Sequence, residues 1–260
     1  MSASKPPKPS NKTKKILLVQ SRSRTEMIAA EQEGYRAALR GIAKLECLSA
    51  LDEKLSWNDP HSFVKAYDGI IFGGSSDYDF DGGRMAKDPF RLLAMIILSR
   101  TRNLISFALA EKIPVLGVCF GHQMLANMYG GEVKRDEAQS KSGTFEVALT
   151  AEGKRDQLFK HLPPTFMAQY GHKDSVTKLP KGAKLLAKGK RCRFAALRYG
   201  ESTYTMQFHP ELTAEQAAKN LNTLSGYLPK GVTDASAVVH ASPEASKLIP
   251  LWIEKVVKAR

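Results

Sequence analysis

A cysteine flanked by glycines stands where an apolar stretch changes into a helical one, and this junction restricts the possible folds most. Residues 114–118 are the apolar stretch, Cys119 follows, and Gly121 lies at the start of the helical segment. A strand that turns so sharply into a helix needs small residues on both sides, and it exposes the central side chain at its carboxyl end. A buried cysteine in a core strand is the alternative. Gly117 and Gly121 favour the sharp turn, in which the helix N-terminus faces a nucleophilic sulfur.

Strand and helix patterns alternate through the first half of the chain. Apolar runs predict strands and helical spacing predicts helices, in the order strand 15–20, helix 25–40, strand 44–50, strand 68–73, helix 89–110 and strand 114–119. This alternation predicts an α/β fold with a doubly wound, mostly parallel sheet, whose ligands bind at the carboxyl ends of the strands.

The second half has a different pattern. We expect five short strands that form a mixed or antiparallel extension of the sheet, at residues 144–150, 165–171, 184–187, 194–198 and 203–208. A loop over residues 225–242 and a final helix over residues 243–258 complete the expectation.

A candidate base follows the last of these strands. His209 and Glu211 flank Pro210, 90 residues after Cys119. Proline fixes its own φ and biases the preceding residue toward extended backbone, so this segment is stiff. In a nucleophile, base and orienter arrangement, His209 takes the thiol proton and Glu211 holds the far imidazole nitrogen. A surface turn with an incidental histidine is the alternative, and the sharp turn at Cys119 favours the catalytic interpretation.

Three segments together resemble the class I, triad-type glutamine amidotransferases. They are Phe-Gly-Gly-Ser at 72–75, Gly-Val-Cys-Phe-Gly-His-Gln at 117–123 and Gln-Phe-His-Pro-Glu at 207–211, and the resemblance spans roughly residues 14–225. It implies the flavodoxin-like fold of that family and release of ammonia from the side-chain amide of glutamine. It also implies a glutamyl thioester on Cys119, with His209 as acid and base and Glu211 as orienter.

Attack on an amide carbonyl produces an oxyanion, which needs hydrogen-bond donors aimed at it. The N–H of Phe120, next after the nucleophile, is one candidate by the geometry of the turn. The resemblance implies the N–H around Gly74 as the other, because glycine pairs permit unusual backbone angles. An ordinary strand-ending turn explains this glycine pair equally well.

The resemblance implies three further binding residues. Gln123 is similar to the glutamine-binding side chain of the family, although a hydrogen bond within its own helix is the alternative. Residues 171–176 resemble a His-x-Asp-x-Val segment of the branch related to guanylate synthetase, which gives His172 and Asp174 a supporting role near the glutamine pocket. An exposed turn between two strands is the alternative for this segment.

Length and cysteine content bear on the organisation of the chain. It has 260 residues, 43% of them hydrophobic, which suffices for one substantial core, and we expect a single domain over residues 14–260. Its three cysteines have no regular spacing, which argues against a disulfide framework and indicates a reducing, cytoplasmic location. Cys47 and Cys192 are interpreted as packing residues. We find no secretory signal and no apolar stretch that reaches the length of a membrane span.

The formal net charge is +13, from 39 Lys and Arg against 26 Asp and Glu. The excess concentrates in residues 1–15 and 178–198. Residues 1–13 are expected to form a disordered basic tail. We find no basic motif interleaved with aromatic residues and no signature of a nucleic-acid-binding fold, so we favour a solvated basic face over nucleic-acid binding. A basic charge could also steer the chain to an acidic partner subunit.

The segment from Asp77 to Asp88 has carboxylates spaced as in a calcium-binding loop. A strand precedes it where a helix is required, and Arg84 occupies an aliphatic position. We therefore interpret it as a mobile lid over the substrate pocket. Cys119 and His122 lack a second ligand pair with zinc spacing, so neither a metal nor a cofactor is expected.

Three functions remain open from the sequence. The first is a glutaminase subunit that passes ammonia to a separate synthetase, because the 35 residues after Ser225 cannot hold a synthetase domain. The second is a stand-alone hydrolase of γ-glutamyl amides or peptides. The third is a non-catalytic binding protein that keeps the fold, and the intact Cys119, His209 and Glu211 argue against it.

Overall fold

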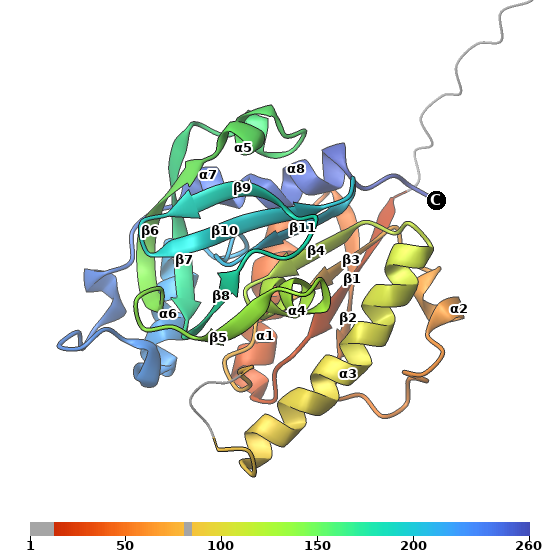
Figure 1. Ribbon diagram of the computed structural model, residues 1–260, viewed down its shortest axis with the longest axis horizontal. Helices are drawn as coiled ribbons and strands as arrows, with labels where there is room; N and C mark the ends of the chain where they lie inside the picture. Colours follow the sequence, from red (N-terminus) through yellow and green to blue (C-terminus); the bar gives the residue numbers. More distant parts are fainter. Residues whose placement is uncertain (1–12, 81–84) are drawn as a thin grey trace, which may run out of the picture.

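A nine-stranded sheet forms the centre of the computed structural model, which describes residues 13–80 and 85–260 (Figure 1). Its strand order is β2-β1-β3-β4-β11-β10-β9-β6-β7. The first five strands in this order pair in parallel and the remaining pairs are antiparallel. The α/β class and the mostly parallel sheet with an antiparallel extension are thus confirmed. The strands are β1 (Lys14–Gln20), β2 (Ala43–Ser49), β3 (Gly69–Phe72), β4 (Val115–Val118), β6 (Lys141–Leu149), β7 (Thr165–His172), β9 (Lys184–Gly189), β10 (Cys192–Tyr199) and β11 (Thr203–Met206).

Helices cover both faces of the parallel half, as the alternation of β1 side chains shows. Ile16 and Leu18 belong to the core cluster that contains residues of α1 and α8, whereas Leu17 and Val19 belong to the cluster of α3 and α4. Successive side chains of a strand point to opposite faces, so β1 is buried on both. The helices are α1 (Thr25–Ala38), α2 (His61–Val64), α3 (Pro89–Ala110), α4 (Phe120–Met128), α5 (Ala151–Arg155), α6 (Ala214–Thr223), α7 (Pro243–Ser246) and α8 (Leu248–Lys255).

A second sheet, helix α6 and the short helices α2 and α5 were not expected from the sequence. Strands β5 (Glu132–Arg135) and β8 (Asp174–Lys178) form a second, two-stranded antiparallel sheet. The first of them is too short and too exposed to give an apolar pattern. Helix α6 does carry a sequence signal: Thr213 and Gln216 form a capping box, in which each side chain accepts the other's backbone N–H.

The final helix differs from the expectation over residues 243–258, because it is divided into α7 and α8 at Lys247. Pro250 lies in the first turn of α8 and has no N–H to donate to the carbonyl of Ser246. The proline therefore separates the two short helices.

Helix α3 corrects the expectation that no apolar stretch is long enough for a membrane span. Its 22 residues are long and apolar enough by length and composition, with 33% of the relevant window buried. One such helix is weak evidence for a span, and α3 packs Ala94, Ile97 and Leu104 into the core. Length and composition therefore do not distinguish α3 from a membrane helix. Its packing on the sheet accounts for its buried apolar residues, whereas Phe90, Leu92, Met95 and Ile96 of the same helix are exposed.

Two further expectations concern segments that are largely or partly outside the described residues. The basic tail lies there except for Thr13, and residues 81–84 of the expected lid lie there too. Asp77 and Asp88, at the two ends of the expected lid, each stabilise the start of a helix. Asp77 accepts hydrogen bonds from the N–H of Ser23 and from Arg24 Nε just before α1, and Asp88 caps α3. These contacts give both carboxylates a structural task.

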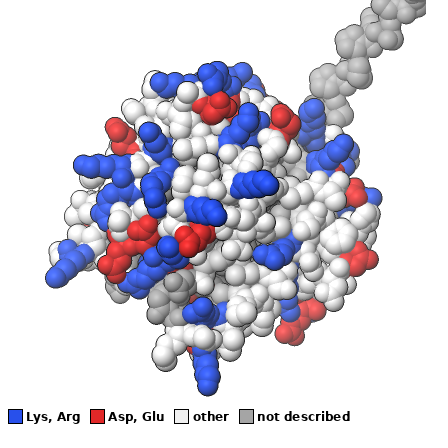
Figure 2. All heavy atoms as spheres, viewed as in Figure 1, with Lys and Arg blue, Asp and Glu red and all other residues white. Residues whose placement is uncertain are grey.

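Basic residues are spread over the face of the molecule that Figure 2 draws. Figure 2 shows Lys and Arg side chains over most of the visible face, with Asp and Glu among them. On this face the distribution agrees with a solvated basic surface more than with one compact anion-binding patch.

Candidate active site

Cys119 occupies the turn between β4 and α4 in a strained backbone conformation. Its φ is 52° and its ψ is −101°, one of two positive φ values among described non-glycine residues. Its N–H donates to Met206 O of β11 at 2.8 Å. A Cβ on Gly121 would overlap Phe72 O, and one on Gly117 would lie 2.7 Å from Gly121 O. The glycines therefore permit the close packing that fixes this turn.

His209 and Glu211 reach Cys119 from the neighbouring strand. Strand β11 pairs in parallel with β4, and the chain continues from β11 directly to His209. His209 Nδ1 lies 2.7 Å from Glu211 Oε1, and the His209 N–H donates to Gln169 O of β7 at 2.9 Å. All three side chains of the expected triad are buried. Adjacent strand ends thus bring together residues that are 90 positions apart in the sequence.

The charge of His209 is set by its neighbours. Burial disfavours the imidazolium, but the Glu211 carboxylate and the Cys119 side chain outweigh this effect and raise the pKa of His209 to about 10. Glu211 also binds the Nδ1 nitrogen, which leaves Nε2 for the sulfur side. The imidazole can therefore hold a proton next to Cys119 and later donate it to a leaving group.

The two expected oxyanion donors differ in their surroundings. The N–H of Phe120 begins α4, and the structure gives it no acceptor within residues 13–80 and 85–260. Gly74 lies beside the nucleophile, because a Cβ on it would be 3.6 Å from Cys119 Cβ. Its N–H, however, donates to Glu31 Oε1 at 3.0 Å. In this arrangement the Gly74 N–H is engaged by a carboxylate and is not aimed at Cys119.

The remaining expected residues are buried close together behind the nucleophile. Gln123 Nε2 donates to Asp174 O at 2.7 Å and to Gln207 Oε1 at 3.2 Å. His172 Nδ1 lies 3.0 Å from Asp174 O, and burial lowers the pKa of His172 to about 3. His172 and Asp174 are 3% and 2% exposed, so the alternative of an exposed turn is wrong. The side chain of Gln123 bonds outside its helix and connects α4 to β8.

Two charged residues at the site were not anticipated. Arg22 follows β1 and Glu31 lies in α1, and both are buried. Arg22 Nε is 3.1 Å from Glu31 Oε1, and Arg22 Nη1 donates to Ser76 Oγ at 3.1 Å. Arg22 stands at the carboxyl end of a parallel strand, the edge where ligands bind in this architecture, and that position was the available signal.

Comparison with known proteins decides the family. The model of the family "Glutamine amidotransferase class-I" matches residues 52–224 of the chain. The chain belongs to the class I glutamine amidotransferase family. The matched range contains the nucleophile turn, His209 and Glu211, and it ends at Leu224, directly after helix α6.

Curated relatives of this amidotransferase share its central part. A subunit of the glutamine-hydrolysing GMP synthase of Methanocaldococcus jannaschii is 39% identical over 137 residues, which cover 50% of this chain and 70% of the relative. The corresponding subunit of Methanococcus aeolicus is 35% identical over 117 residues, covering 45% of this chain and 60% of the relative. A glutamine amidotransferase of Thermotoga maritima has the same fold, with a TM-score of 0.67, 20% identity and coverage of 94% and 96% of the two chains.

Proposed function

We propose that this amidotransferase hydrolyses the side-chain amide of glutamine with Cys119 as nucleophile. The observation that carries the proposal is the placement of Cys119 at a strained strand-helix turn beside the hydrogen-bonded pair of His209 and Glu211. Nucleophile, base and orienter in contact are the structural signature of covalent catalysis. The relatives named glutamine-hydrolysing GMP synthase support the choice of glutamine as the substrate.

The reaction proceeds in two steps. The sulfur of Cys119 attacks the amide carbon, and the thiol proton is held by His209. The oxyanion is stabilised by the Phe120 N–H, and the C–N bond breaks as His209 donates its proton to the departing ammonia. Water then attacks the thioester, His209 takes a proton from that water and returns it to the sulfur, and glutamate leaves.

The engaged N–H of Gly74 suggests low activity for the isolated chain. An oxyanion hole with one donor in place instead of two loses transition-state stabilisation, on the order of 100-fold in rate for one donor. A synthetase partner that binds near Gly74 and releases its N–H from Glu31 would raise the activity. We therefore assign the ammonia to a separate synthetase, in agreement with the relatives, which are named as one subunit of GMP synthase.

The catalytic proposal is tested by replacing the nucleophile. Cys119→Ser should lower ammonia release from glutamine to the background level, while the thermal unfolding curve stays close to that of the wild type. Cys47→Ser is the matched control, because Cys47 is a free cysteine on β2, away from the triad. Equal ammonia release from Cys119→Ser and wild type would refute the mechanism.

A further inference from the structure

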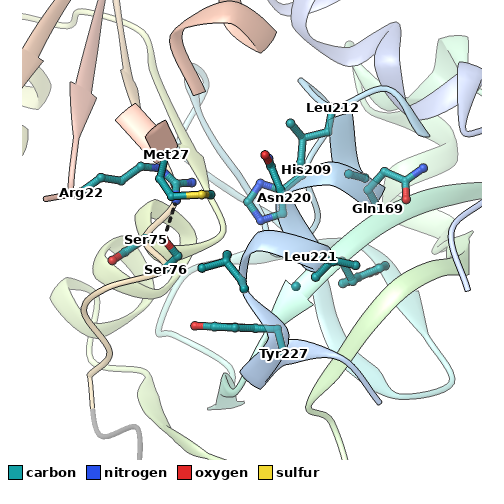
Figure 3. A pocket seen from close by; sticks show the side chains of 14 residues that line it. Arg22, Met27, Ser75, Ser76, Gln169, His209, Leu212, Asn220, Leu221 and Tyr227 are labelled. Atoms are coloured by element: carbon teal, nitrogen blue, oxygen red, sulfur yellow. Dashed lines mark hydrogen bonds between the residues drawn. The ribbon is translucent and has the colours of Figure 1, made fainter. Parts of the chain in front are cut away.

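A pocket beside His209 is the feature of the site that ammonia release does not require. Arg22, Ser76 and Met27 line one side of it, and His209, Leu221 and Tyr227 line the other (Figure 3). His209 is the residue that donates a proton to the leaving nitrogen. The group attached to that nitrogen therefore points toward the residues that surround His209.

The wall opposite Arg22 is mostly apolar and comes from a late part of the chain. Leu221 and Leu224 belong to helix α6 and its end, and Tyr227 follows in a 3-10 turn at Ser225–Tyr227. Tyr227 lies beyond residue 224, where the match to the family model ends. An ammonia molecule uses no apolar wall, whereas an aliphatic side chain gains by leaving water there.

Arg22 supplies a buried cation with unused donors in the same pocket. Its side chain is 7% exposed, and it contacts Glu31 and Ser76. Within residues 13–80 and 85–260 the structure gives Arg22 Nη2 no hydrogen-bond partner. Nη2 would lie 3.0 Å from a Cβ on Gly74, and His209 Cε1 would lie at the same distance from it. The free donors of this guanidinium are thus next to the catalytic groups.

A guanidinium with free donors binds a carboxylate with matching geometry. In a γ-glutamyl amino acid, the carboxylate of the leaving group is two bonds from the scissile nitrogen, about 4 Å from the attacked carbon by ordinary bond lengths. The α-carboxylate of the glutamyl part is separated from that carbon by three methylene or methine carbons. The leaving-group carboxylate is therefore the one that fits a cation adjacent to Cys119 and His209.

We propose that this pocket is a leaving-group subsite for γ-glutamyl derivatives of aliphatic amino acids, with Arg22 binding the carboxylate and Leu221, Leu224 and Tyr227 contacting the side chain. This inference rests on the proposed thioester mechanism at Cys119. The sulfur–carbon bond forms, the C–N bond to the amino acid breaks, and His209 gives its proton to the departing amine. One water molecule then hydrolyses the thioester and releases glutamate.

The test compares three substrates with the full-length protein: γ-glutamyl-leucine, the γ-glutamyl amide of isopentylamine, and glutamine. Isopentylamine is leucine without its carboxylate, so the first two substrates differ only in the group assigned to Arg22. The wild type should have a kcat/KM for γ-glutamyl-leucine about 10- to 100-fold above that for the isopentylamide, the range for a charge-assisted hydrogen bond. Equal values for these two substrates would overturn the proposal.

Variants of Arg22 test whether its guanidinium causes the preference for γ-glutamyl-leucine over the isopentylamide. Arg22→Gln should reduce the ratio between γ-glutamyl-leucine and the isopentylamide to about 1, and Arg22→Lys should leave an intermediate ratio because it keeps charge without the planar fork. Arg36→Gln is the matched control and should retain the wild-type ratio, since Arg36 is exposed on α1, donates to Gln32 Oε1 at 3.5 Å and does not line the pocket. A loss of activity by Arg22→Gln that is equal for all three substrates would show that Arg22 binds the glutamyl part, and would refute the assignment.

Two further results separate this inference from the catalytic proposal. Labelling of Cys119 by a γ-diazoketone analogue of glutamine reports an intact nucleophile without any amine leaving group, and it verifies that each variant is folded at the site. Cleavage of glutamine alone would overturn the leaving-group subsite and leave the thioester mechanism standing. No cleavage of any substrate and no labelling of Cys119 would overturn both.

Discussion

At the scale of single residues, the site combines a strained nucleophile with a base whose charge is fixed by its partners. The positive φ of Cys119 is tolerated because glycines on both sides let β3 and α4 approach the turn closely. His209 is buried, and yet its pKa is raised, because its interactions with Glu211 and Cys119 outweigh the effect of burial. Removal of either partner should therefore be visible in the titration of His209.

Glu211→Gln should lower the pKa of His209 from about 10 and reduce kcat/KM for glutamine, since the amide orients the imidazole without stabilising its charge. The stabilisation has a defined pH range. A pKa of about 10 in the folded chain against the usual 6.5 contributes stability that is fully present below pH 6.5 and is lost as the pH rises through 10. The free energies of unfolding of the wild type and Glu211→Gln, measured with urea, should thus differ most near pH ~6 and least near pH ~10.

Glu201→Gln is the control for that series, because the Glu201 side chain is 94% exposed. Its unfolding free energy should follow the wild type at every pH. A wild-type advantage over Glu211→Gln that grows with rising pH would contradict the assignment of the proton to His209.

At the scale of elements, strand ends position the catalytic groups. Strands β3, β4 and β11 are neighbours in the sheet, and Gly74, Cys119 and His209 follow their carboxyl ends. Helix α4 starts at the nucleophile, and its Gly121 N–H donates to Gly73 O at 3.1 Å. The contact between β3 and α4 therefore fixes both the turn and the backbone of the Gly73 and Gly74 pair.

Gly121→Ala tests this contact. The added Cβ would overlap Phe72 O, so β3 and α4 must separate, and we expect a loss of about 2–4 kcal/mol in unfolding free energy together with reduced labelling of Cys119. Chemical denaturation measures the first effect and the diazoketone analogue the second. Gly226→Ala, where nothing lies within 4 Å of the added Cβ, should change the unfolding free energy by less than about 1 kcal/mol. Equal stability of the two variants would argue against a constrained turn.

Much of the sheet could be predicted because buried strands leave apolar runs, and the nucleophile turn could be predicted because close packing demands glycine at 117 and 121. Strand β5 could not, since its Glu, Lys and Arg are exposed, its single Val is half-buried, and the four residues carry no periodic signal. The engagement of the Gly74 N–H could not be predicted either. It depends on Glu31, 43 residues away, and the sequence does not reveal which buried carboxylate a backbone donor meets.

At the scale of the whole molecule, the C-terminal segment completes the core of the sheet's parallel half. Trp252 of α8 is fully buried, and a Cβ on Gly69 of β3 would lie 2.9 Å from it. Lys14 Nζ also donates to Ile253 O at 2.6 Å, which links the first strand to the last helix. The end of the chain thereby stabilises the strands that carry the site.

Trp252→Ala should cost about 3–5 kcal/mol, because it leaves a cavity under β1 and β3 that the surrounding residues fill only in part. For a chain of this size the loss corresponds to a decrease in Tm of roughly 10 °C. Differential scanning calorimetry is the measurement. Leu179→Ala, at a leucine that is 40% exposed, should leave Tm within about 2 °C of the wild type, and a similar decrease for both variants would refute the role of Trp252.

Because β4 pairs in parallel with β11, the chain between them, which includes β5 to β10, can differ in length and sequence without moving these two strands apart. The separation between nucleophile and base is set by two adjacent strands, so the length of the intervening chain does not enter it. This intervening chain nevertheless supplies Gln169 and Gly171 to the pocket beside His209. Grafting a different β5 to β10 region onto the same two strands should therefore change substrate choice, and it keeps the catalytic geometry only if the graft retains a carbonyl that accepts from the His209 N–H, as Gln169 O does here.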